Sequence, residues 1–215
     1  MYGGYIPMKK DMKKEVMEEV TIEEPSYGQI ISDQAANSAS SLIRGKFRDT
    51  VHPDGSRSSV CALAAGNIIK EAGFPIPDDG NGNQITNAAN FFDQISGHPY
   101  AIKNYNTEFM ANKEYENWKV IDNMEDLQPG DVILFKGSGY ERMMAGNPTK
   151  TNPSGYHIGI STSEWSDSWG GMRNMTGGIN LVDDRGPTLI WNRHKSEYGM
   201  EQHFLKAARY VGPND

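Results

Sequence analysis

The single cysteine of this 215-residue chain lies where a thiol could act as a nucleophile. Cys61 closely follows Ser58 and Ser59, which are suited to cap a helix, so the cysteine falls in the first turn of the helical segment VCALAAGNIIKEAG. Unpaired N–H groups and the helix dipole lower the pKa of a thiol in such a position, and the thiolate is the reactive form. One cysteine also excludes an internal disulfide and a zinc site of the CxxC type. Cys61 is therefore either a small buried apolar residue or a nucleophile.

A nucleophilic cysteine needs a base, and His157 is the histidine placed to be one. It opens the apolar alternating run HIGI directly after the loop TNPSGY, so its ring is expected to project from the rim of a sheet, where a helix N-terminus can pack. The other four histidines lie in polar or charged stretches, at positions 52, 98, 194 and 203. His157 is the predicted base, and an ordinary core or edge histidine is the alternative.

Three segments occur in a telling order: SSVCALAAGNIIKEAG, then LQPGDVILF, then GYHIGI. This pattern resembles the NlpC-type and CHAP-type cell-wall hydrolases, a papain-like superfamily. In that family a Cys opens a helix, Pro-Gly-Asp introduces a strand, and a strand beginning His-(Val/Ile)-(Gly/Ala)-(Ile/Val) carries the base. Here Asp131 stands 26 residues before His157. The resemblance covers about residues 35–212 and implies a papain-like fold and cysteine-dependent hydrolysis of an amide in peptidoglycan.

The sequence departs from the family pattern at two points. The acidic residue that often precedes the nucleophile in the NlpC type is Val60 here. The resemblance also implies a third, polar catalytic residue on the strand after the histidine strand. Chain order places it in MRNMTGGINL at Asn174, with Asp167 and Asn180 as alternatives. An Asn can accept the imidazole N–H and fix the tautomer of the base.

The resemblance implies acyl transfer through the cysteine. His157 would deprotonate Cys61 or hold it as a thiolate–imidazolium pair, and the thiolate would attack the carbonyl carbon. Backbone N–H groups at the helix start, with Ser58 or Ser59, would stabilise the oxyanion. Aromatic residues of the polar segments are expected to line a groove for a polar polymer, with ordinary packing as the alternative: Tyr140, Tyr156, Trp165 and Trp169.

The elements that must position these residues are helices first and strands afterwards. Asp33 is expected to cap a helix that runs to about residue 46, and the other helices are expected at 60–73 and 87–96. The expected strands are 118–121, 132–135, 156–161, a hairpin in MRNMTGGINLV that turns at 177–178, LIWNRH and FLKAARYV. Helices followed by an antiparallel sheet make an α+β domain, which we place at residues 30–215.

Residues 1–29 form a separate N-terminal arm. Met8, Met12, Val16 and Val20 recur every fourth residue, which gives a narrow apolar stripe on a helix that Pro25 ends. We expect the arm to attach the domain to other virion proteins, and a solvated tail is the alternative. The lysines near the start are not followed by an apolar run, so no signal peptide is expected.

Composition excludes several classes of function. The formal net charge is −7, which argues against binding nucleic acid through phosphate contacts, and no apolar stretch is long enough for a transmembrane helix. The segment DDGNGN offers oxygens from Asp79, Asn81 and Asn83, a spacing that can bind calcium. Gln84 and Asn90 occupy the positions where an EF-hand needs Gly and Glu. With HExxH also absent, no metal or other cofactor is expected.

The expected function is a cysteine-dependent peptidoglycan amidase or endopeptidase. Without an export signal, it would be a phage virion-associated or tail-associated lysin, or an endolysin, found in the virion or in the host cytoplasm before lysis. Two alternatives stay open. One is a structural virion or tail protein that keeps the fold without activity, and the other is an amide hydrolase or acyltransferase with a substrate outside the wall.

Overall fold

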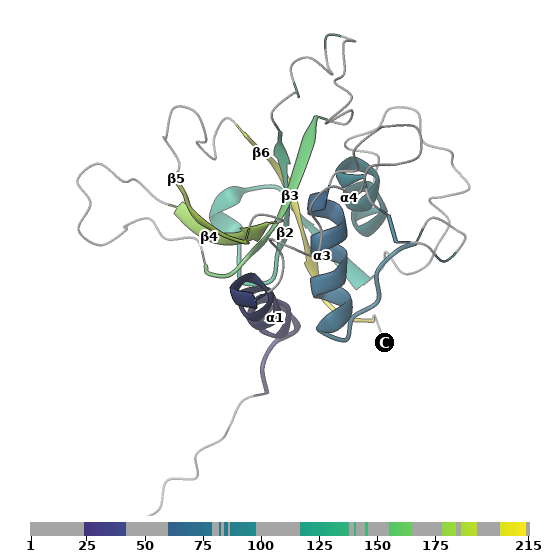
Figure 1. The fold of residues 1–215 in the computed structure, drawn as a ribbon, viewed down its shortest axis with the longest axis vertical. Helices are drawn as coiled ribbons and strands as arrows, with labels where there is room; N and C mark the ends of the chain where they lie inside the picture. Colours follow the sequence, from purple (N-terminus) through teal and green to yellow (C-terminus); the bar gives the residue numbers. More distant parts are fainter. Residues whose placement is uncertain are drawn as a thin grey trace, which may run out of the picture.

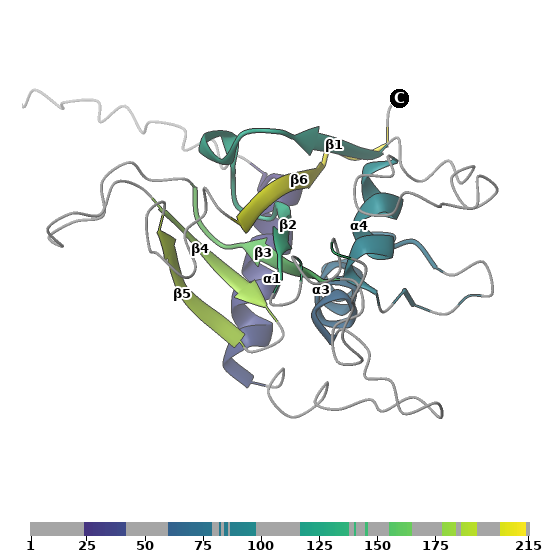
Figure 2. The same cartoon turned by 90° about the horizontal axis from the view of Figure 1, so that it is seen from above.

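The computed structural model describes residues 24–41, 60–78, 82, 84–85, 87–97, 117–137, 140, 145, 155–164, 178–183, 186–192 and 203–213. Within these residues three helices come first, α1 (Tyr27–Ser41), α3 (Val60–Glu71) and α4 (Ala88–Ser96). Six strands follow, with the 3-10 turn η3 (Met124–Asp126) after the first: β1 (Trp118–Ile121), β2 (Val132–Lys136), β3 (Tyr156–Ser161), β4 (Gly178–Asp183), β5 (Gly186–Asn192) and β6 (Phe204–Tyr210). Figure 1 shows the helices packed on one side of the sheet, and Figure 2 shows the same layers from above. The expected α+β class is confirmed.

The six strands form one sheet in the order β1-β6-β2-β3-β4-β5, and every neighbouring pair is antiparallel. β2 lies inside the sheet between β3 and β6, although β6 is the last strand of the chain. β3, which carries the predicted base, is also an interior strand. None of the described helices is both long and apolar enough to span a lipid bilayer.

Local capping signals explain two of the helices. The side chain of Asn87 accepts hydrogen bonds from two amides in the first turn of α4, and Gly97 ends that helix in the left-handed conformation at φ 67°. Gly73 follows α3 with φ 91°, a conformation in which glycine alone is unstrained. Both helices lie within two residues of their predicted ranges, because the glycines that follow them and the Asn87 cap are signals local to each segment.

α1 differs from its prediction. It begins at Tyr27, and the Oγ of Ser26 accepts a hydrogen bond of 3.2 Å from the Gln29 amide, so Ser26 caps the helix. Asp33 is not a cap, because it lies inside α1 and accepts a side-chain hydrogen bond from Gln29. The helix therefore crosses the expected boundary between the arm and the domain at residues 29–30. Residues 1–23 of the arm lie outside the described part of the chain.

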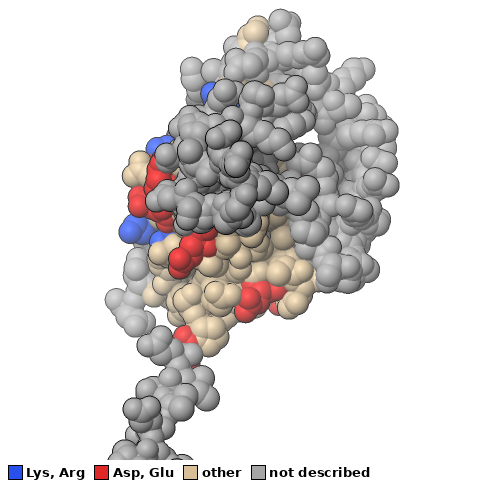
Figure 3. Space-filling view, turned by 90° about the vertical axis from the view of Figure 1, so that its left-hand side faces the viewer, with Lys and Arg blue, Asp and Glu red and all other residues tan. Residues whose placement is uncertain are grey.

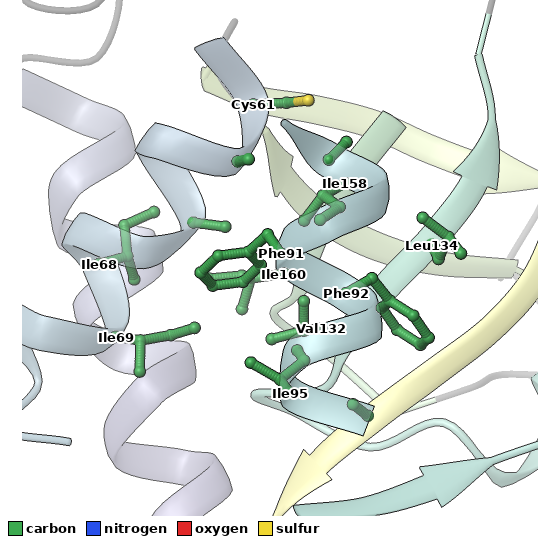
Figure 4. Close-up of a cluster of buried hydrophobic side chains, with 14 of the residues drawn as sticks. Cys61, Ile68, Ile69, Phe91, Phe92, Ile95, Val132, Leu134, Ile158 and Ile160 are labelled. Carbon is green, nitrogen blue, oxygen red and sulfur yellow. The ribbon is translucent and has the colours of Figure 1, made fainter. Parts of the chain in front are cut away.

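The sheet is buried on both faces. On one face a cluster of large side chains joins the helices to the strands, as Figure 4 shows: Ile68, Ile69, Phe91, Phe92, Ile95, Val132, Leu134, Ile158 and Ile160. The other face buries Ile133, Phe135 and Leu181 in a second cluster, against which Met124 of η3 and Phe204 of β6 pack. Full burial of each such side chain contributes about 1.5–3 kcal/mol. The core thus holds α3 and β3 in fixed relative positions.

The C-terminal hairpin turns later than the sequence pattern predicts. Asp183 pairs with Gly186 and Gly178 with Asn192, so the chain reverses at residues 184–185. The predicted turn at 177–178 is wrong, since Gly178 is already the first residue of β4. The alternation of Ile179 and Leu181, both buried, continues the strand to the acidic residues that follow.

The Pro-Gly-Asp segment, which leads into β2, contacts both α1 and β6. Gly130 has φ 85°, and a Cβ at this position would lie 2.2 Å from the carbonyl oxygen of Gly28 in α1. The buried carboxylate of Asp131 accepts two hydrogen bonds from Arg209, of 2.8 and 2.9 Å. Burial raises the pKa of Asp131, and Arg209 opposes that shift. The motif therefore anchors the start of β2.

Candidate active site

Cys61 lies in the first turn of α3 with its side chain extending toward the sheet (Figure 4). The residue is 3% exposed. Three alanines of the same helix, Ala62, Ala64 and Ala65, are also buried, and their small side chains allow α3 to pack closely on β3. The sequence prediction that a cysteine opens a helix packed on the sheet is confirmed.

His157 lies near the start of β3 and has two polar neighbours. Its Nε2 is 3.0 Å from Oδ2 of Asp183, and because a carboxylate can only accept, Nε2–H donates. The His157 side chain is also hydrogen-bonded to Cys61. Since Nε2 faces the carboxylate, Nδ1 is the ring nitrogen left for the sulfur. The imidazole thus stands between a thiol and a carboxylate.

The register of the sheet explains why Asp183 reaches His157. Ile160 pairs with Val182, and continuing that antiparallel register puts Asp183 opposite Gly159. His157 is two residues from Gly159 and therefore shares its face of the sheet. Gly159 has no side chain to stand between the two groups, and a Cβ there would lie 2.9 Å from Cδ1 of Leu181. The glycine of HIGI leaves room for this diagonal contact.

The surroundings of His157 favour its protonated form. Burial alone lowers the pKa of the ring, but the charge of the Cys61 sulfur, the hydrogen bonds to Asp183 and Cys61 and the charge of Asp183 outweigh it and raise the pKa to about 10. The His157 side chain is 19% exposed and that of Asp183 is 0% exposed, so solvent screens their ion pair only weakly. The ring is therefore held as an imidazolium between the Cys61 sulfur and the Asp183 carboxylate.

These three residues have the arrangement of a nucleophile, a base and a group that orients the base. Asp183 was not among the sequence candidates. A signal for it was present, because the run INLVDD ends an alternating strand on an acid, but its use depended on knowing the register of β4. The family pattern places the third residue on the strand after the histidine strand, and Asp183 lies on that strand. The sequence analysis applied the same pattern but chose Asn174.

Several predicted site residues lie outside the described part of the chain: Ser58, Ser59, Trp165, Asp167, Trp169 and Asn174. Asn180 is described and belongs to β4. The backbone N–H of Asn180 donates to Ser163 Oγ at 3.0 Å, and its backbone carbonyl accepts from the Thr162 N–H. These bonds hold Asn180 at the end of β3 that is far from His157. The described partner of His157 is Asp183 rather than Asn180.

The two described aromatic candidates are packed together. The rings of Tyr140 and Tyr156 meet edge to face with centroids 5.3 Å apart. Tyr156 is 5% exposed, and burial, with smaller contributions from Tyr140 and Asp93, raises its pKa to about 12. The expectation that Tyr156 lines an open groove is corrected, because its ring is part of the core. Tyr140 is half-buried and lies at its edge.

The predicted calcium ligands Asp79, Asn81 and Asn83 also lie outside the described residues. Asp78 and Gln84 on either side of them form an isolated antiparallel bridge, so the two ends of this loop are held together. No group of three or more His, Cys, Asp or Glu side chains within the described ranges could hold a metal ion.

A groove of about 600 Å³ lies elsewhere on the molecule, along β1 and η3. Lys119, Arg209, Asp122 and Glu125 are among its lining residues, whereas Cys61 and His157 are not. Figure 3 shows acidic and basic side chains next to one another on the face it presents, and the groove itself is lined by four acidic and two basic residues. This surface does not resemble the basic stripe of a nucleic-acid-binding protein.

No protein-family model matches the chain, and no curated protein or solved structure is significantly similar to it. The assignment of the site therefore depends on the geometry of Cys61, His157 and Asp183.

Proposed function

We propose that this chain is a cysteine-dependent peptidoglycan amidase or endopeptidase with a papain-like fold of the NlpC/CHAP type. The observation that carries the proposal is the position of His157 between Cys61 and Asp183, at the junction of a helix start and an interior strand. The order of the three sequence segments supports the choice of peptidoglycan as the substrate.

The reaction follows from the roles of the three side chains. The Cys61 thiolate attacks the carbonyl carbon of the amide and gives a tetrahedral oxyanion. His157, as imidazolium, protonates the departing amine while Asp183 stays ionised and holds the ring by Nε2–H. Water then attacks the thioester, His157 accepts its proton, and collapse of the intermediate releases the acid product and restores the Cys61 thiolate beside the imidazolium. Backbone N–H groups at the start of α3, together with Ser58 or Ser59, stabilise the oxyanion.

The proposal includes a place in the phage life cycle. The apolar stripe of residues 8–20 supports attachment of the domain to another virion or tail protein. The enzyme then acts from the particle during infection, or as an endolysin from the host cytoplasm.

The test is digestion of purified cell walls by the wild type and by Cys61→Ala, followed as loss of turbidity and as release of new amino groups. We expect Cys61→Ala to lose at least about a hundredfold in rate, because the covalent step is removed. Asp126→Asn, a change on exposed η3, is the matched control and should retain full activity. Digestion by Cys61→Ala at the wild-type rate would refute the cysteine mechanism.

A structural virion protein is the second candidate, and the low exposure of Cys61 favours it. A nucleophile must be reached by its substrate, and a sulfur on a 3% exposed residue is reached only if neighbouring groups move. Alkylation of Cys61 by iodoacetamide separates the two candidates. A structural protein leaves the thiol as unreactive as a buried cysteine and the cell walls intact. A reactive thiol without wall digestion points to an amide substrate outside the wall.

A further inference from the structure

Gln84 is bonded to the helix that carries the candidate nucleophile. Its Nε2 donates a hydrogen bond of 2.8 Å to the backbone carbonyl of Leu63, two residues after Cys61 in α3. In an α-helix such a carbonyl also accepts from the N–H four residues later, and its second lone pair is available to the Gln84 amide. The bond therefore joins the first turn of α3 to a residue 21 positions later in the chain.

Gly66 makes room for this bond. A Cβ at position 66 would overlap Nε2 of Gln84 and would lie 3.3 Å from Cε2 of Phe91, which reaches toward α3 from α4 (Figure 4). Gly66 lies inside α3 and does not have a positive φ, so its backbone conformation does not require glycine. Glycine is unfavourable inside a helix relative to alanine. The contact with Gln84 gives the physical reason for a glycine at this position.

The backbone that carries Gln84 is itself anchored. Gln84 forms an isolated antiparallel bridge with Asp78, and the next residue, Ile85, is 6% exposed and belongs to the same core cluster as α3. Two residues after Ile85, Asn87 caps α4. The Gln84 side chain thus holds the first turn of α3 from a fixed support.

We propose that Gln84 is a positioning residue, which orients the first turn of α3 so that the Cys61 sulfur stands beside His157. This inference rests on the proposed function. The outer side-chain atoms of a helix lie about 5–6 Å from its axis, so a rotation of α3 by about ten degrees would move the sulfur by about 1 Å. A misplacement of about 1 Å can cost about a hundredfold in rate. Gln84 acts through the backbone of α3 and takes no part in proton transfer.

The test breaks the same bond in two ways. Gln84→Ala removes the donor, whereas Gly66→Ala keeps Gln84 and displaces its amide with a methyl group. In the double variant the methyl group has no amide to displace, so its effect should equal that of Gln84→Ala alone. Gln34→Ala is the matched control, because Gln34 donates at 3.1 Å to the side chain of Glu71 at the far end of α3.

Two quantities are measured in each variant. They are kcat and KM for the release of amino groups from solubilised wall fragments, and the pKa of His157 by NMR titration. Gln84→Ala and Gly66→Ala should each lower kcat about ten- to a hundredfold, with KM unchanged. Both should also lower the pKa of His157 from about 10, because burial lowers this pKa and the charge of the Cys61 sulfur is the largest contribution that raises it. Gln34→Ala should keep the wild-type values.

The outcomes separate the positioning role from the proposed function. If kcat and the His157 titration are unchanged in Gln84→Ala and Gly66→Ala, even with lower stability in urea, Gln84 is only a structural contact and the proposed function stands. If the wild type does not digest walls, the proposed function fails, and the titration alone decides whether Gln84 positions the sulfur: a lowered His157 pKa supports this role and an unchanged one overturns it. Should Gln84→Ala not fold, Gly66→Ala makes the same test with the Gln84 side chain present.

Discussion

Removing the charge of Asp183 while keeping its shape tests the central contact of the site. In the wild type, His157 Nε2 lies 3.0 Å from the Asp183 carboxylate. In Asp183→Asn the amide oxygen can still accept this hydrogen bond, but the ion pair is lost. A hydrogen bond to a charged group contributes about 1.5–3 kcal/mol. At about 1.4 kcal/mol for each pKa unit, the pKa of His157 should fall by about one to two units. From about 10 it should reach about 8 to 9.

The assay is an NMR titration of the histidine ring signals, which are few because the chain has 5 histidines. His157→Gln assigns the signal, and Asp126→Asn controls for the loss of a carboxylate far from the ring. Circular dichroism at each pH checks that the fold persists. A His157 pKa that is unchanged in Asp183→Asn, or that rises, would refute the argument that Asp183 stabilises the imidazolium. In active enzyme the alkaline limb of the rate profile should move to lower pH by the same amount.

Three further predictions concern stability, each measured by urea unfolding. Gly130→Ala should lower the free energy of unfolding by more than about 3 kcal/mol, because its Cβ would meet the backbone of α1. Gly73 has a similar φ but open space around it, so Gly73→Ala should lower that free energy by only about 1–2 kcal/mol. Equal losses in the two variants would contradict the contact between Gly130 and α1. Arg209→Met should lower the free energy of unfolding by about 3–5 kcal/mol at neutral pH, and by less in acid, where Asp131 takes up a proton. A loss that does not depend on pH would count against a stabilising Arg209–Asp131 ion pair. The raised pKa of His157 contributes stability in full below pH 6.5, and this contribution is lost as the pH rises toward about 10; His157→Gln should remove that slope.

The parts of the fold that were predictable from sequence carry their signals locally. Asn87 and Gly97 delimit α4, and the alternation after the loop TNPSGY delimits β3, so both were found at the right residues. α1 was misplaced because two polar residues, Ser26 and Asp33, could each cap a helix, and the choice is made by packing. The start of α1 lies against Gly130, which is distant in the chain.

Cys61 and His157 stood out in the sequence because each stands at the edge of an element with a clear pattern. Asp183 was not among the sequence candidates, because its contact with His157 depends on strand register, which is a property of two strands and of the turn between them. Gly178 was taken for a turn residue, since glycine favours turns, yet it opens a strand whose buried residues continue to position 182. Moving the turn to 184–185 brings an acid opposite Gly159 and next to the base.

The contact between Gly28 and Gly130 determines which part of the domain would bear a pull on the N-terminal segment. It joins the point where the chain enters the domain to the start of β2, whereas Lys136, the last residue of β2, is at the end that holds His157. The five residues of β2, each rising about 3.3 Å, separate the two ends. Force applied to the chain before residue 24 would therefore load α1, the Asp131–Arg209 pair and the foot of the sheet, at the opposite end of β2 from His157.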